Sequence, residues 1–171
     1  MHMYYTGGGL VELTDAEIAR LVGCSKTITD APRREMLEEN GHRRNDFKCT
    51  ATDGDERFRV FMRQNSTYAD SFSVGLAYFL PEGGEIILVR CNGPHGEVVD
   101  DPMEGSASPH FGFHIHHATE DNISNARLPE AGGTITTEYG TFEDAMAYFV
   151  QLCGITDADK CFPHLGNPTL F

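Results

Sequence analysis

The spacing of apolar residues first follows a helical period. In residues 14–23, Thr14 and Glu17 form the capping-box pattern that starts many helices. Three apolar residues then follow at helical spacing: Ile18, Leu21 and Val22. Gly23 is placed to end the element. The pattern therefore predicts a short N-terminal helix.

The next segment, residues 30–41, is mostly charged and has two interpretations. Pro32 suits the first turn of a helix, and Asn40-Gly41 suits its end. These residues predict a second short helix, but the composition is equally typical of an ordered loop.

From residue 46 the period changes to two, which is typical of strands. Four strands are predicted, at 46–52, 58–65, 71–80 and 85–92. An Asp53-Gly54 pair between the first two is a hairpin signal. The other connections are also short, which favours an antiparallel meander. The run 86–89 is apolar on both faces, as in a central strand.

Residues 110–119 predict a strand with imidazoles on one face. Successive side chains of a strand point to opposite faces. One face would carry His110, His114 and His116. The other would carry Phe111, Phe113, Ile115 and His117. Residues 134–139 predict a sixth short strand.

A final helix is predicted at residues 142–153, because Thr141 and Asp144 form a capping pattern ahead of an apolar stripe. The sequence thus predicts a single α+β domain over 14–155. Its sheet would have five to six mostly antiparallel strands, with the C-terminal helix on one face and the first helix at an edge or end. Residues 1–13 are expected to be flexible, and 156–171 to form a tail. The expected core is Phe58, Val60, Val74, Leu76, Leu88, Phe113, Ile115, Ala145 and Phe149.

Composition excludes several classes of protein. The chain has 171 residues, a net charge of −13 and five cysteines without a Cys-x-x-Cys pair. This cysteine pattern argues against a disulfide framework and against a zinc finger. No apolar run is long enough to span a membrane, and no signal peptide is evident, so we expect a cytoplasmic protein without a membrane partner. The acidic charge disfavours a general electrostatic grip on duplex nucleic acid.

The strongest chemical signal is the pair His114 and His116. Imidazoles two residues apart on a strand can reach one point in front of the sheet. Such convergence suits a metal ion, and it equally suits acid–base catalysis by two imidazoles. A solvated polar face without a function is the alternative interpretation.

Two further segments carry candidate site residues. Arg90-Cys91-Asn92-Gly93-Pro94-His95 ends the fourth strand, and Arg63-Gln64-Asn65 ends the second. Arginine holds phosphate or carboxylate with a planar fork. We therefore expect Arg63, Arg90, Asn92, His95, His114 and His116 to meet at one pocket. Arg57, Arg59 and Arg63 form either a basic stripe or a solvated face balanced by acids. Lys26, His42 and His164 are isolated and are expected at the surface.

These segments and the closing helix occur in an order that resembles a family of small prokaryotic proteins known only as a domain of unknown function. Its members share an Arg-x-Asn/Asp-Gly-x-x-His segment, a His-x-His strand and a final helix. The resemblance covers roughly residues 14–155 and implies the same architecture and the same site residues. It implies no activity. This chain departs from the family pattern in His117 and in the segment after Ile155.

Three functions remain open from the sequence. The first is a metal-independent phosphodiesterase, such as a toxin-like endoribonuclease acting on a locally bound RNA or nucleotide. Its catalytic residues would be His114, His116, His95, Arg90 and Arg63, and its substrate-binding residues Asn92, Gln64, Asn65 and His110. The second is a zinc or other divalent-metal site, hydrolytic or structural, with ligands among His114, His116, His110, His95 and Glu120. The third is a non-catalytic acidic protein that binds a protein partner, such as an antitoxin or a counter-defence inhibitor.

Overall fold

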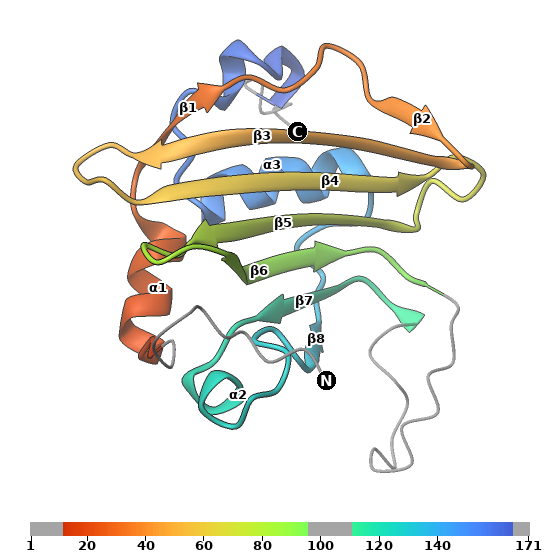
Figure 1. Ribbon diagram of the computed structural model, residues 1–171. Coiled ribbons are helices and arrows are strands. Elements are labelled where there is room, and N and C mark those ends of the chain that lie inside the picture. The colour runs from red at the N-terminus through yellow and green to blue at the C-terminus, as the bar shows by residue number, and fades with distance from the viewer. Residues whose placement is uncertain (1–11, 96–110, 166–171) are drawn as a thin grey trace.

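One antiparallel sheet organises the chain (Figure 1). The structure is a computed structural model that describes residues 12–95 and 111–165. Most of the predicted N-terminal flexible segment, the loop after His95 and the last six residues lie outside these ranges. The elements are α1 (Asp15–Gly23), β1 (Lys26–Asp30), β2 (Leu37–Glu39), β3 (His42–Ala51), β4 (Arg57–Asn65), β5 (Phe72–Phe79), β6 (Glu85–Asn92), β7 (His114–His117), α2 (Glu120–Ser124), β8 (Gly133–Ile135), α3 (Phe142–Leu152), η2 (Ala158–Lys160) and η3 (Pro163–Leu165).

The strands follow one another as a meander. Their order across the sheet is β1-β3-β4-β5-β6-β7-β8, and β2 pairs with β3 beside β1. Each pairing of these strands is antiparallel. The predicted α+β class and antiparallel sheet are confirmed. The described ranges hold eight strands, more than the five to six expected.

The additional strands come from the segment before residue 46. The second helix predicted over residues 30–41 is wrong, because Leu37–Glu39 form β2 instead. Asn40 and Gly41 have φ angles of 52° and 77° and turn the chain back into β3. Two successive residues in this left-handed region make the tight turn that joins hairpin strands. The Asn-Gly pair therefore marks a strand reversal and not a helix end.

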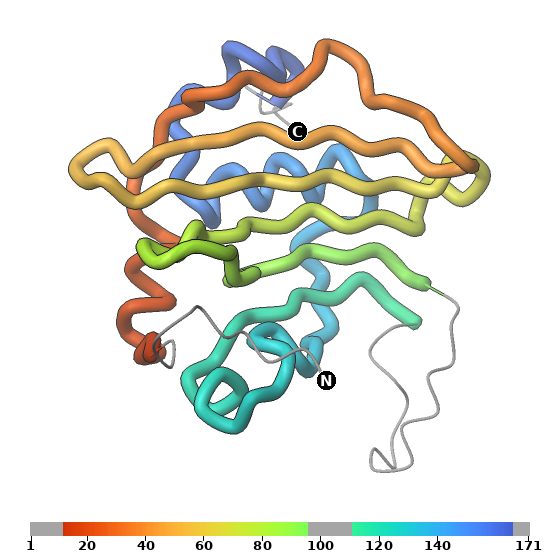
Figure 2. The backbone as a smooth tube through the Cα atoms, in the orientation of Figure 1, coloured from red at the N-terminus to blue at the C-terminus, as the bar shows by residue number. Residues whose placement is uncertain are grey.

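The core lies between the sheet and the helices. Figure 2 shows α3 running behind β3, β4 and β5, and α1 at one end of the sheet. Both predicted caps are confirmed: Thr14 forms the capping box of α1, and Thr141 Oγ1 accepts from the Asp144 N–H of α3. Every predicted core residue is buried except Phe113, which is partly buried against the core. In the described parts of the chain no helix is both long and apolar enough to cross a membrane.

The segment after the last helix packs onto the first strands of the sheet. Ile155 bridges to Lys26, and the Asp157 carboxylate accepts a hydrogen bond of 3.0 Å from the Ile28 N–H. The Phe162 ring lies 5.8 Å from the ring of Phe47, between centroids. These contacts fix residues 155–162 against β1 and β3.

Candidate polar site on the open face of the sheet

The sheet face opposite α3 carries most of the polar residues that the sequence singled out. The strand register aligns Arg63, Ser73, Asn92 and His114 in one row across four strands. The neighbouring row contains Phe61, Gly75, Arg90 and His116. Paired residues in a sheet project to the same face. Imidazole, amide and guanidinium groups from separate segments therefore lie side by side.

His114 is fully buried and its ring is held from both sides. Its Nδ1–H donates to the Gly112 carbonyl at 2.8 Å, and its Nε2 lies 3.4 Å from the Asn92 amide nitrogen. Since Ser73 Oγ donates to Asn92 Oδ1 at 2.9 Å, the amide turns its N–H₂ toward His114. A carbonyl only accepts, so His114 Nδ1 bears a proton and the neutral ring accepts from Asn92. The chain of bonds fixes both orientation and tautomer.

His116 is also buried and is anchored in the same way. Its Nδ1–H donates to the Glu130 carbonyl at 3.0 Å, and its ring centroid lies 4.9 Å from that of His114. A Cβ atom at Gly133 would come within 3.1 Å of the His116 ring. Glycine is therefore the residue that lets β8 lie this close to both imidazoles.

Glu130 is a buried acid that the sequence did not single out. It is 5% exposed, and its carboxylate lies 4.0 Å from the Arg90 guanidinium. Arg90 Nε and Glu130 Oε2 are buried without a hydrogen-bond partner in the described structure. Glu130 is one of 26 acidic residues and belongs to no regular element, so no periodicity marked it. The pair adds an incompletely satisfied ion pair beside His116.

His95 owes its position to the backbone before it. The Gly93 N–H donates to the Phe72 carbonyl at 3.0 Å, and a Cβ atom on Gly93 would lie 1.7 Å from the Asp70 carbonyl oxygen. Glycine is thus required where the chain leaves β6. This path brings the half-buried His95 ring to 5.1 Å from His114, between centroids, with the planes at 63°. His95 is the imidazole that links the buried pair to the surface.

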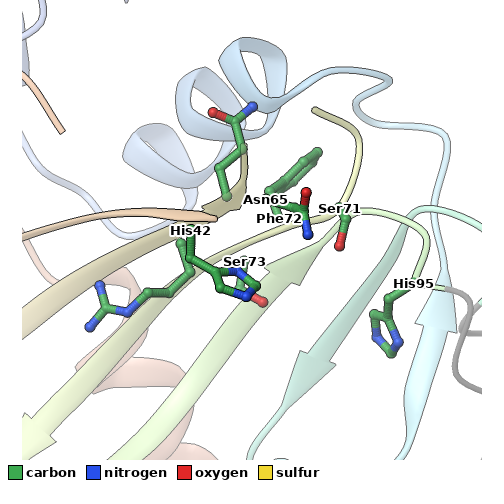
Figure 3. A pocket seen from close by; sticks show the side chains of 8 residues that line it. His42, Asn65, Ser71, Phe72, Ser73 and His95 are labelled. Atoms are coloured by element: carbon green, nitrogen blue, oxygen red, sulfur yellow. The ribbon is translucent and has the colours of Figure 1, made fainter. Parts of the chain in front are cut away.

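A pocket of about 220 Å³ opens beside His95, at the end of β4 and the start of β5 (Figure 3). It is lined by His42, Arg63, Gln64, Asn65, Ser71, Phe72, Ser73 and His95. The residues Arg90, Asn92, His114 and His116 do not line it. The predicted site residues therefore fall into two adjoining groups, which meet at His95 and Ser73.

The arginines of β4 are paired with acids. Arg63 forms two bonds with the Asp46 carboxylate, at 2.9 and 3.3 Å, and Arg59 pairs with Glu85 and Asp46. The Phe61 ring lies between them, 5.4 and 5.8 Å from the two guanidinium carbons. The sequence allowed either a basic stripe or a solvated face balanced by acids, and the structure shows the second arrangement for Arg59 and Arg63. The Arg63 Nε–H edge makes no hydrogen bond to a described residue.

Gln64 and Asn65 use their side chains in the turn between β4 and β5. Asn65 Oδ1 accepts from the backbone N–H groups of Thr67 and Tyr68 at 2.8 and 2.9 Å. Gln64 Nε2 donates to the Ala69 carbonyl at 3.0 Å. Both residues line the pocket, and their amides stabilise its wall.

The remaining candidates lie elsewhere. His110 is outside the described residues. Glu120 is exposed in the first turn of α2, and its carboxylate accepts from the Asp15 N–H of α1 at 3.4 Å. Across the residues that the structure describes, no group of three or more His, Cys, Asp or Glu side chains has metal-binding geometry.

Comparison with protein-family models, with curated proteins and with solved structures found no match for the chain. The resemblance to the uncharacterised prokaryotic family therefore stays a prediction, and function has to be argued from the site itself.

Proposed function

We propose that the chain is a metal-independent phosphodiesterase that cleaves RNA at the pocket beside His95. The observation that carries the proposal is that a histidine, an arginine and a serine line one open cavity: His95, Arg63 and Ser73. Imidazole can accept or donate a proton near neutral pH, and guanidinium stabilises the charge on a transferring phosphate.

The two groups of residues have different roles in this proposal. His95 faces the pocket and carries a proton during the reaction. His114 is a positioning residue, because its ring packs against His95 while its own nitrogens are engaged with Gly112 and Asn92. Arg63 would hold a phosphate oxygen through its Nε–H edge while it keeps its pair with Asp46.

The reaction is transesterification within RNA. The 2′-oxygen forms a bond to phosphorus while a base accepts its proton. The bond from phosphorus to the 5′-oxygen breaks, and an acid supplies the proton that this oxygen takes up. The products are a 2′,3′-cyclic phosphate and a 5′-hydroxyl.

The test is cleavage of a short single-stranded RNA in the presence of EDTA. The wild-type protein should give cyclic-phosphate ends, and His95→Ala should be slower by roughly 10²- to 10⁴-fold, the usual contribution of a general acid or base. His164→Ala, an exposed histidine in η3, serves as the matched control and should match the wild type. Equal rates for His95→Ala and wild type would overturn the assignment.

A divalent-metal site is the second candidate. His114 and His116 both donate Nδ1–H to backbone carbonyls, which is how metal-binding imidazoles are commonly oriented. The Asn92 amide faces His114 Nε2, so a zinc ion at this nitrogen would have to displace the amide. We therefore favour the metal-independent reaction. Zinc bound stoichiometrically by the wild type and lost in His114→Ala and His116→Ala would favour the metal site. If the purified protein neither bound metal nor cleaved RNA, the remaining candidate would be a non-catalytic acidic protein that binds a protein partner.

A further inference from the structure

The proposed reaction requires two proton carriers, and the pocket contains a second imidazole. We propose that His42, which the sequence pattern left as an isolated surface residue, acts with His95 as the acid–base pair of this site. The inference rests on the proposed function and names a residue that the proposed function does not include.

The sheet order places the two histidines on opposite sides of the pocket. His42 is the first residue of β3 and pairs with Asn65 of β4, whereas His95 follows β6. Arg63 of β4 and Ser73 of β5 lie on the strands between them, and these residues line the same cavity. Figure 3 shows the His42 and His95 rings entering from these two directions. His42 and His95 therefore flank the two strands that carry Arg63 and Ser73.

The surroundings of His42 suit proton transfer better than those of His114. His42 is exposed, and its ring forms no hydrogen bond or ion pair with the described residues. Its ring nitrogens are therefore not engaged by another described side chain. His114 is fully buried, and protonation at Nε2 would oppose the Asn92 amide N–H₂ that faces it.

Proton bookkeeping fits a pair of imidazoles. One imidazole starts neutral and accepts the proton of the attacking 2′-hydroxyl as the oxygen–phosphorus bond forms. The other starts as imidazolium and gives its proton to the departing 5′-oxygen. The two histidines end in exchanged protonation states, and solvent resets them.

The hairpin turn explains why the sequence pattern did not place His42 at the site. His42 directly follows Asn40-Gly41, whose left-handed conformation reverses the chain. The reversal brings the start of β3 beside the end of β4. Read as the end of a helix, the same residues leave His42 without neighbours.

The experiment is the pH dependence of kcat/KM for RNA cleavage in EDTA, for wild type, His42→Ala, His42→Gln and the control His164→Ala. The wild type and the control should give a bell-shaped profile. Both His42 variants should lose one limb and fall by roughly 10²- to 10⁴-fold, with circular dichroism confirming the fold. His42 variants within twofold of wild type and with both limbs intact would overturn the role of His42 while the phosphodiesterase survives.

A separate arm distinguishes failure of the pair from failure of the enzyme. Inorganic phosphate is titrated into the wild-type protein, and the ring signals of His42, His95 and His164 are followed by NMR. Shifts of His42 and His95 alone support the pair as a phosphate site even if no RNA is cleaved. Absence of shifts at His42, while His95 moves, overturns the inference.

Discussion

Lys26 and the Arg90–Glu130 pair differ in how completely their polar atoms are hydrogen-bonded. Lys26 is fully buried, and its ammonium donates to the carbonyls of Val22, Cys24 and Cys153 at 2.8, 2.9 and 2.9 Å. All three of its donors are used, and the ammonium also lies 4.6 Å from the centroid of the Phe58 ring. Arg90 and Glu130, on the open face of the sheet, are 4.0 Å apart and keep buried atoms without a partner in the described structure.

The difference is one of hydrogen-bond satisfaction. The carbonyls around Lys26 belong to the ends of α1 and α3, where helix dipoles favour a cation, so the lysine joins both helices to β1. The ammonium is therefore fully satisfied. The Arg90 and Glu130 side chains beside His116 are only partly satisfied in the described structure, which is uncommon for buried polar atoms.

The largest expected effect is loss of the Lys26 ammonium. Lys26→Met keeps the length of the side chain but leaves three buried carbonyls without a donor. We expect the free energy of unfolding to fall by roughly 3 kcal/mol or more, since each buried unsatisfied group costs about 1–3 kcal/mol. Urea denaturation measures it. Lys48→Met, on the exposed side of β3, should change stability by less than about 0.5 kcal/mol, and equal effects for the two variants would contradict the comparison.

Asn92 should have the next largest effect. Asn92→Ala removes the acceptor of Ser73 and the donor to His114 in a buried place, which we expect to cost roughly 1–3 kcal/mol. Asn125→Ala is the matched control, because Asn125 also makes two side-chain hydrogen bonds but is exposed. The control should lose less than about 1 kcal/mol. A similar loss of stability in both variants would mean that burying the hydrogen bonds of Asn92 does not increase their contribution to the free energy of unfolding.

The burial of the helix-covered face of the sheet can be tested through the ionisation of its cysteine thiols. Burial raises the pKa of Cys91 to about 12 and that of Cys49 to about 12, so both stay protonated in the folded protein while the unfolded chain ionises from about pH 9. The stability they contribute is complete below pH 9 and is lost between pH 9 and 12. Cys91→Ala should therefore reduce the pH slope of unfolding free energy in this window by about 1.4 kcal/mol per pH unit. An unchanged slope in urea denaturation at pH 9 to 11 would argue that Cys91 is not buried.

The smallest effect should come from Glu130. In Glu130→Gln the backbone carbonyl that accepts from His116 is kept, and only the weak pair with Arg90 is lost. We expect stability to change by less than about 1 kcal/mol. The measurement is urea denaturation beside Lys26→Met. A loss as large as that of the lysine variant would show that the two buried charges are held equally well.

Local patterns predicted much of the fold. The caps at Thr14 and Thr141, the alternating strands and the histidine strand depend on residues close in sequence, and the structure has them as elements. The histidine strand is shorter than predicted and spans only His114–His117. The sequence pattern failed where the environment of a side chain depends on backbone groups that are distant in sequence. Lys26 was expected at the surface, but it is buried and donates to backbone carbonyls at the ends of two helices. One of these carbonyls belongs to Cys153, which is 127 residues away in the sequence. The pattern of side chains along the chain contains no information about such backbone partners.

The site was predictable only in part for the same reason. The alternation of residues along the strands put Arg90, Asn92, His114 and His116 on one face, and the register bears this out. Sequence alone did not show that His114 would be sealed while His95 lines a pocket. It also did not single out Glu130, Ser73 and His42, because their positions depend on residues that are distant in sequence.

The most direct test of the account is binding of a DNA dinucleotide, which has the phosphodiester but lacks the 2′-hydroxyl and so cannot be cleaved by the proposed reaction. Histidine ring signals of the wild-type protein are followed by NMR during the titration. The account predicts that the signals of His42 and His95 move together and saturate, while that of His164 stays in place. Unchanged signals at His42 and His95 up to saturating dinucleotide would contradict a phosphodiester site at this pocket.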